Sequence, residues 1–151
     1  MRVSTDNQQF GFYVTRLAGR DMFRFQMIVS GQVIGDTEPC ILGSAMKQLG
    51  NLQTFDDERL AEISSDPAAA IFALRTDQFL HDASTLSLAE SLDQWLVNGF
   101  IYDGRVVMLA EDYRDGTASG VLLTSLVDPV EYDSIFHAVR AYWSETKSAV
   151  R

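Results

Sequence analysis

Residues 95–111 read WLVNGFIYDGRVVMLAE, and this stretch decides the fold. The dipeptide Asp103-Gly104 is typical of a type I′ turn, which joins two antiparallel strands through a loop of two residues. The runs on either side, Trp95–Tyr102 and Arg105–Glu111, are rich in branched and aromatic residues, as strands are. A hairpin needs both arms, so the stretch predicts two paired strands.

The residues before the hairpin carry mixed signals. Ser87-Leu88-Ala89-Glu90 matches a capping box. The apolar residues of this stretch also have helical spacing: Leu88, Leu92, Trp95 and Leu96. The pattern leaves helix or strand open for residues 68–98, and the hairpin favours strand from about Trp95 onward. After the hairpin, residues 112–119 are predicted as a polar loop and residues 120–127 as a further strand.

Apolar residues near the N-terminus alternate with polar or small ones. This alternation predicts a half-buried antiparallel meander, and its members are Phe10, Phe12, Val14, Phe23, Phe25, Met27, Val29, Val33 and Ile34. Residues 1–8 precede the pattern, and we expect them to form a disordered tail. We expect residues 1–151 to form a single domain, because no linker or repeat interrupts them.

Helical spacing appears at residues 42–49, where Gly50 is a natural stop, and a turn or two of helix is expected within residues 56–64. Asp66-Pro67 resembles a helix start, with Asp as N-cap and Pro at the first position. The apolar run at residues 68–74 that follows suits a helix or a buried strand.

The C-terminal pattern is the clearest. Asp128 suits the N-cap and Pro129 the first position of a helix that runs to about Glu145. The negative charge of Glu131 is favourable in the first turn of such a helix. One face of this helix is apolar, and we expect it to pack on the protein's own sheet: Tyr132, Ile135, Phe136, Val139, Tyr142 and Trp143. The predicted class is α+β, an antiparallel sheet (the N-terminal meander plus the later hairpin) packed against this helix and one or more shorter helices.

Composition restricts the kind of protein. The chain of 151 residues is 46% hydrophobic and carries 9 Phe, which indicates a folded globule. Cys40 is the only cysteine, so no internal disulfide can form, and a lone cysteine fits a reducing compartment. No apolar run is long enough to span a bilayer. We expect a cytoplasmic protein that neither enters a membrane nor needs a cofactor.

Charge is unevenly distributed along the chain. Residues 1–50 hold five basic and four acidic residues, whereas residues 51–151 hold seven basic and seventeen acidic residues. Direct nucleic-acid binding is disfavoured, because phosphate contact needs a basic patch. The acidity either keeps the protein soluble or faces a basic partner.

Residues that could carry chemistry are sparse. His81 and His137 are far apart in sequence, and neither has a nucleophile beside it. Cys40 suits a buried small residue, and one Cys with two His disfavours a structural zinc site. We therefore expect no enzymatic activity, no catalytic or cofactor-binding residues and no metal site. Paired carboxylates occur in two clusters in polar stretches: Asp56, Asp57 and Glu58, and Glu111, Asp112 and Asp115.

Several short segments resemble one known family. Phe23–Val29 running into Gly31–Asp36 is similar to an aromatic strand that ends in an "Ile-Gly-Asp"-like motif, and residues 44–49 match the Ser-containing helix that follows. Ser91–Val97 resembles a "Phe-Asp-x-Trp" entry into a hairpin, with Leu92 in place of Phe. Arg105–Leu109 resembles the returning strand. Val130–Ile135 resembles the start of a C-terminal helix, with Tyr132 in place of Phe. Together these segments resemble family 42 of the immunity proteins of bacterial polymorphic toxin and contact-dependent inhibition systems.

The resemblance implies a function. An immunity protein of this kind binds and neutralises a cognate toxin, usually the C-terminal domain of a larger effector, and so protects the producing cell and its siblings. A nuclease is one candidate for that toxin, since nucleases are often basic and an acidic surface would attract them. The two carboxylate clusters are then the predicted toxin-binding residues. A non-catalytic adaptor, chaperone or regulatory module is the alternative.

Overall fold

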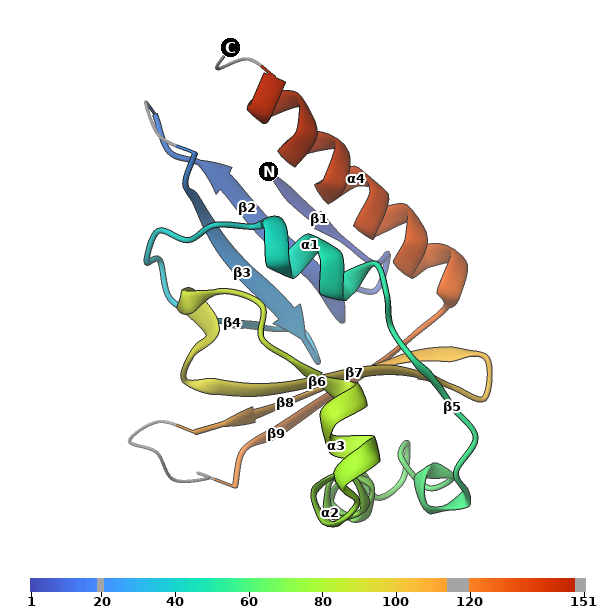
Figure 1. Ribbon diagram of the computed structural model, residues 1–151. Helices are drawn as coiled ribbons and strands as arrows, with labels where there is room; N and C mark the ends of the chain where they lie inside the picture. Colours follow the sequence, from blue (N-terminus) through green and yellow to red (C-terminus); the bar gives the residue numbers. More distant parts are fainter. Residues whose placement is uncertain (19–20, 114–119, 149–151) are drawn as a thin grey trace.

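The computed structural model describes residues 1–18, 21–113 and 120–148. Two sheets form its centre (Figure 1). The first is an antiparallel meander with its strands in chain order: β1 (Arg2–Ser4), β2 (Phe10–Arg16), β3 (Phe23–Val29) and β4 (Gln32–Ile34). The predicted meander is confirmed.

The second sheet is built around the predicted hairpin of β7 (Trp95–Tyr102) and β8 (Arg105–Asp112). Asp103 and Gly104 have φ of 48° and 69°, the positive values that a type I′ turn requires. β9 (Leu122–Val127) pairs antiparallel with β8. Two short strands lie along the other edge of β7, β5 (Thr54–Phe55) parallel to it and β6 (Thr85–Leu86) antiparallel.

The helices occupy two places (Figure 1). Beside the first sheet lie α1 (Gly43–Leu49) and α4 (Pro129–Ser148). At the opposite end, against the second sheet, lie η1 (Glu58–Leu60), α2 (Pro67–Thr76) and α3 (Gln78–Ser84). A further short helix, η2 (Glu90–Leu92), leads into β7. The α+β class predicted from sequence is therefore correct.

The second sheet separates two hydrophobic cores. On β8, Val106, Met108 and Ala110 belong to the core shared with the first sheet, α1 and α4. The residues between them, Val107 and Leu109, belong to the core covered by α2, α3 and η1. Successive side chains of a strand point to opposite faces. β8 is therefore buried on both sides and lacks the polar alternation of a surface strand.

Helix α4 packs as its stripe predicts. Asp128 accepts hydrogen bonds from the backbone N–H groups of Val130 and Glu131, which confirms the N-cap. Tyr132 stacks on Phe10 with ring centroids 5.6 Å apart, and its hydroxyl donates to the carbonyl of Leu49 at 2.7 Å. Burial raises the pKa of the Tyr132 phenol. The hydrogen bond of this hydroxyl connects α4 to the C-terminal end of α1.

Helix α2 resolves one ambiguity of the sequence. The carboxylate of Asp66 accepts from the N–H of Ala69, and Pro67 occupies the first turn, so the Asp-Pro helix start is confirmed. The capping box at residues 87–90 is wrong. Glu90 is the first residue of the 3₁₀-helix η2, and the N-cap of η2 is Ala89, which has no side-chain oxygen to accept a hydrogen bond. Strand formation in β7 outweighs the local helical spacing, because β7 is paired along both edges.

Two further expectations need correction. Residues 1–8 are not a disordered tail, since β1 pairs with β2 and Thr5 is buried. Asp112 belongs to β8 and not to a loop, and most of the loop predicted at residues 112–119 lies outside the described residues. Helix α3 lies in the stretch of residues 68–98 for which the sequence left helix or strand open. None of the helices in the described part of the chain combines the length and apolar character of a membrane span.

Candidate functional site

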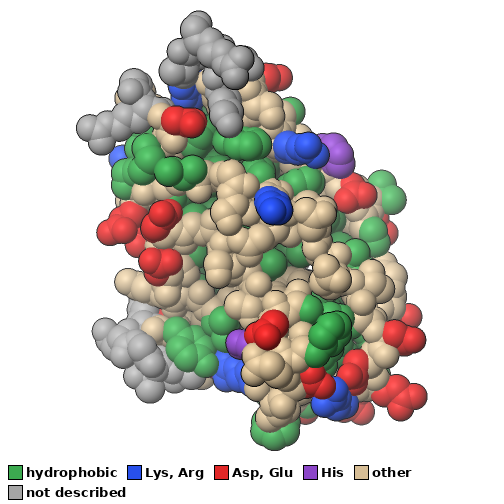
Figure 2. All heavy atoms as spheres, in the orientation of Figure 1, with side chains coloured by type: hydrophobic (Ala, Val, Ile, Leu, Met, Phe, Trp, Pro, Cys, Tyr) green, Lys and Arg blue, Asp and Glu red, His purple; other side chains and the backbone are tan. Residues whose placement is uncertain are grey.

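The first candidate site is formed by η1, α2, α3 and the residues that join them, which we call the acidic end. Residues 54–86 contain seven acidic and two basic residues, a balance of −5 out of the −9 of the whole chain. Figure 2 shows Asp and Glu side chains gathered at the lower right, beside hydrophobic side chains and one cationic group. Asp56 and Glu58, from the first predicted carboxylate cluster, are exposed here.

Asp57, the middle member of that cluster, is engaged within the protein. Its carboxylate accepts from the N–H of Arg59 as the N-cap of η1 and pairs with the Arg59 guanidinium at 2.7 Å. The same guanidinium reaches Asp77 at 2.8 Å, and Asp77 caps α3 by accepting from the N–H of Leu80. One arginine thus connects η1 to the start of α3.

These contacts stabilise the charged forms of the groups involved. Hydrogen bonds from Arg59 lower the pKa of Asp57 to about 2 and also lower the pKa of Asp77. Hydrogen bonds to the two carboxylates raise the pKa of Arg59. Asp57 and Asp77 therefore remain anionic throughout the neutral range and keep their ion pairs with Arg59, which join η1 to α3.

Two phenylalanines project from the acidic end into solvent. Phe72 on α2 is 70% exposed, and Phe79 on α3 is 72% exposed. Phe79 retains one aromatic neighbour, Phe55 of β5, with ring centroids 6.4 Å apart. Aromatic side chains are enriched in protein–protein interfaces, so two exposed rings on consecutive helices suit a site that binds another protein.

Sequence reasoning missed both rings, although a signal for one of them was present. At 100° per residue, Phe72 lies about 200° around the helix from Ala70. The buried positions of α2 (Ala70, Ile71, Ala73 and Leu74) fall on the opposite side. A helical wheel of residues 67–76 would have placed Phe72 in solvent. The run at residues 68–74 had been interpreted only as apolar.

The second carboxylate cluster is not a surface patch. Glu111 and Asp112 are each only 6% exposed at the end of β8, so the expectation that they lie in a polar stretch within reach of a partner is wrong. Glu111 forms an ion pair with Arg75 of α2. The Arg75 guanidinium also lies over the Tyr113 ring, 5.4 Å from its centroid, within the reach of a cation–π contact. Asp115 lies outside the described residues. Of the predicted binding residues, Asp56, Asp57 and Glu58 therefore lie at the acidic end, whereas Glu111 is buried.

A second candidate site is a groove of about 700 Å³ between α1 and α4. Its floor contains the buried side chains of Leu49, Val106 and Phe136 and the half-buried ones of Ile101 and Trp143. Gly50 also lines it, and a Cβ there would come within 3.0 Å of the Phe136 ring, so this glycine lets α4 approach α1 closely.

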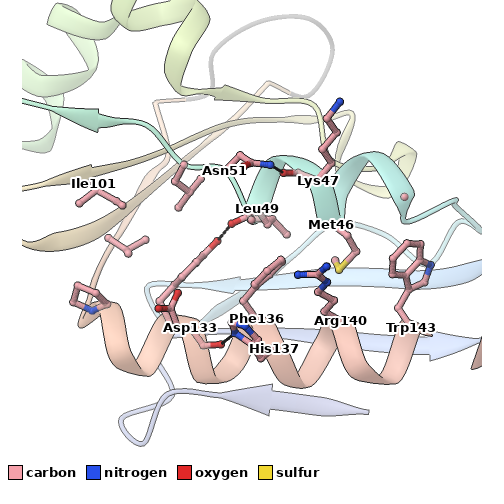
Figure 3. Close-up of a pocket in the computed structure, with 16 residues that line it drawn as sticks. Met46, Lys47, Leu49, Asn51, Ile101, Asp133, Phe136, His137, Arg140 and Trp143 are labelled. Carbon is pink, nitrogen blue, oxygen red and sulfur yellow. Dashed lines mark hydrogen bonds between the residues drawn. The ribbon is translucent and has the colours of Figure 1, made fainter. Parts of the chain in front are cut away.

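The polar groups of the groove are mainly basic. Arg140 and Lys47 are exposed cations on opposite walls, and His137 and Asp133 complete the α4 side. In Figure 3, Arg140 extends from α4 toward α1 and ends beside Met46, whereas Lys47 extends outward. His137 Nδ1 lies 2.6 Å from the carbonyl oxygen of Asp133 within the same helix. The groove is therefore apolar along its floor and carries a cation at one end.

Two further residues of chemical interest are Cys40, which lies apart from both sites, and His81, which lies on α3 of the acidic end. Cys40 is buried, as expected, and its thiol donates to the carbonyl of Phe23. Burial, with Glu90 adding to it, raises the pKa of this thiol to about 11. His81 Nδ1 is buried without a hydrogen-bond partner. Within the described ranges, no three His, Cys, Asp or Glu side chains are grouped so that they could hold a metal ion.

Comparisons of the chain with protein-family models, with curated proteins and with solved structures found no match. The two sites therefore have to be interpreted from their own geometry.

Proposed function

We propose that this protein binds a basic protein partner through the acidic end. The observation that carries the proposal is the exposure of Phe72 and Phe79, at 70% and 72%, on a segment whose net charge is −5. Binding energy in protein interfaces is concentrated in a few large side chains, aromatics among them, that become buried on association. Two such rings with charges around them have the composition of an interface centre and its rim.

The charges contribute differently from the rings. Asp56 and Glu58 are exposed, so they attract a basic partner over a distance and raise the association rate, an effect that salt weakens. Asp57 and Asp77 are engaged with Arg59 and act by keeping η1 and α3 in place. Glu111 and Asp112 are buried, so the proposal does not include them as contacts.

The partner best supported is a toxin, and the protein then acts as an immunity protein in the cytoplasm of the producing cell. Two independent considerations favour this. The chain resembles immunity family 42 in four short motifs: Phe23–Asp36, Ser91–Val97, Arg105–Leu109 and Val130–Ile135. Its acidic end complements a basic surface such as the substrate cleft of a nuclease, which it would cover and so close to nucleic acid. Neutralisation by occlusion requires only binding, with no catalytic residue in this chain.

The test uses the C-terminal domain of the large protein encoded directly before this gene, where a cognate toxin is expected. Binding is measured with Phe72→Ala, Phe79→Ala and the pair Asp56→Lys/Glu58→Lys. Each Phe→Ala change should weaken affinity by roughly 30-fold, the effect of a typical hot-spot residue. The charge reversal should act mainly on the association rate and more strongly at low salt.

Val130→Ala is the matched control, because Val130 is an apolar side chain that is 78% exposed on α4, away from the acidic end. It should bind the toxin like the parent. Protection of cells that express the toxin should follow the same order as the affinities. If the toxin domain does not bind, or if all the variants bind and protect equally well, the proposed function is wrong.

A further inference from the structure

The groove between α1 and α4 is separate from the acidic end, and it differs from the rest of the protein in charge. The chain has a net charge of −9, yet the charged groups lining the groove are Lys47, Arg140 and Asp133, a balance of +1 with His137 neutral. Of the described acidic side chains, none forms an ion pair with Arg140. An exposed guanidinium that no carboxylate of the same protein neutralises can bind an external anion.

The shape of the groove restricts what such an anion would be. Its lining along α4 runs from Pro129 to Trp143, a rise of about 21 Å at 1.5 Å per residue. The volume of about 700 Å³ lies within the range of small-molecule sites. The space is therefore long, open to solvent along one side and lined below by apolar side chains.

The polar groups also define a direction. Arg140 and Trp143 lie at one end, and Ile101 lies at the other (Figure 3). Asp133 precedes Arg140 by seven residues, about 10 Å along the helix, and its carboxylate would repel an anionic group at the Ile101 end. A ligand with one charged end would thus be held with that end at Arg140 and its apolar part over Leu49 and Phe136.

We propose that this groove binds a free amphipathic anion, a single alkyl chain that ends in a carboxylate. The carboxylate accepts hydrogen bonds from the Arg140 guanidinium, which presents paired donors that match its two oxygens. The alkyl chain covers the apolar floor, and each CH₂ removed from water tightens binding roughly fourfold. Lys47, on the opposite wall, adds positive potential at the mouth.

The groove contains its own reporter. Trp143 lines it, and the only other tryptophan is Trp95 of β7. In a Trp95→Phe protein, the fluorescence of Trp143 alone reports on the groove. The probe is dodecanoate, kept below its micelle concentration, with decanoate and octanoate as shorter chains and dodecyltrimethylammonium as a cation of equal chain length.

Dodecanoate should change the Trp143 signal saturably and raise the melting temperature, as a ligand of the folded state does. Affinity should fall with each shorter chain, and the cationic amphiphile should bind at least tenfold more weakly. Arg140→Gln should weaken dodecanoate binding roughly tenfold. Arg24→Gln removes the same charge from an exposed position on β3 outside the groove lining and should leave binding unchanged.

Several results would overturn the proposal. They are the absence of a saturable signal, equal affinity for the cation, and an equal loss of affinity in the Arg140→Gln and Arg24→Gln proteins. Vesicles of anionic phospholipid form a separate arm. Binding to vesicles without binding to monomeric dodecanoate would show that the groove recognises a membrane surface and not a free amphiphile. Circular dichroism of Arg140→Gln, whose side chain is exposed, verifies that this variant is folded.

Discussion

The acidic end and the groove lie on different helices of the same protein, and their aromatic and charged side chains are arranged in opposite ways. At the acidic end, aromatic rings point outward and the ordered charges hold the helices together. In the groove, the aromatic rings of Phe136 and Trp143 form a floor, and the cation of Arg140 pairs with no acidic side chain among the residues that the structure describes. The two regions also differ in charge, with a balance of −5 over residues 54–86 and of +1 among the charged groups that line the groove. The difference in the placement of the rings comes from which side of each helix its neighbours cover.

The same substitution at the two sites should have very different effects on stability. Phe136 is 6% exposed and packs between α1 and the first sheet, so Phe136→Ala should lower the free energy of unfolding by about 3–5 kcal/mol. Phe72 is 70% exposed, so Phe72→Ala should change it by less than about 0.5 kcal/mol. Urea denaturation measures both. Similar values for the two variants would contradict the assignment of one ring to the core and the other to the surface.

The ion pair between Arg75 and Glu111 should give an intermediate effect. Arg75→Ala leaves the Glu111 carboxylate buried at the end of β8 without its cation, which should cost about 2–3 kcal/mol. Glu111→Gln keeps the shape of the buried side chain and removes its charge, so it should cost less. The comparison is made by urea denaturation at neutral pH. A larger loss in Glu111→Gln than in Arg75→Ala would be inconsistent with a buried charge that depends on Arg75.

The smallest effect should come from the exposed network around Arg59, and it should depend on pH. The pKa of Asp57 is lowered to about 2 in the folded protein, against about 4 for an unperturbed Asp. A lowered folded pKa stabilises the protein above the unfolded value, and this contribution is lost as pH falls through the folded one. The melting temperature of Arg59→Gln should therefore lie slightly below that of the parent at pH 5, and the two should converge toward pH 2. A gap that stays constant over this range would show that Arg59 acts by packing alone.

Sequence patterns predicted the elements whose signals agree with one another. The hairpin at Asp103-Gly104 combined turn chemistry with strand composition, and α4 combined a cap, a proline and a stripe, so both were correct. The residues before β7 had a helical signal that strand pairing overrode. Local spacing cannot report on that pairing, because the partners of β7 lie elsewhere in the chain.

The candidate sites were harder to predict for a related reason. Counting acidic residues identified Asp56 and Glu58 correctly as exposed, but gave Glu111 the same status, although Arg75 from a distant helix lets it be buried. The groove was not foreseen at all, because Met46 and Phe136 come from segments ninety residues apart and are brought together only when α1 and α4 meet. Burial and pairing between distant segments are tertiary properties, which a charge count along the chain does not contain.

The strand β8 also has a consequence for how this protein can change over generations. Its consecutive residues alternate between the two cores, so each helical layer rests on its own set of β8 side chains. Substitutions on the inner faces of α2 and α3 change the packing against Val107 and Leu109. Those on the inner faces of α1 and α4 change the packing against Val106 and Met108. The strand itself should tolerate few changes, because almost every position is buried. The two helical surfaces, by contrast, can diversify independently of each other around a nearly constant sheet.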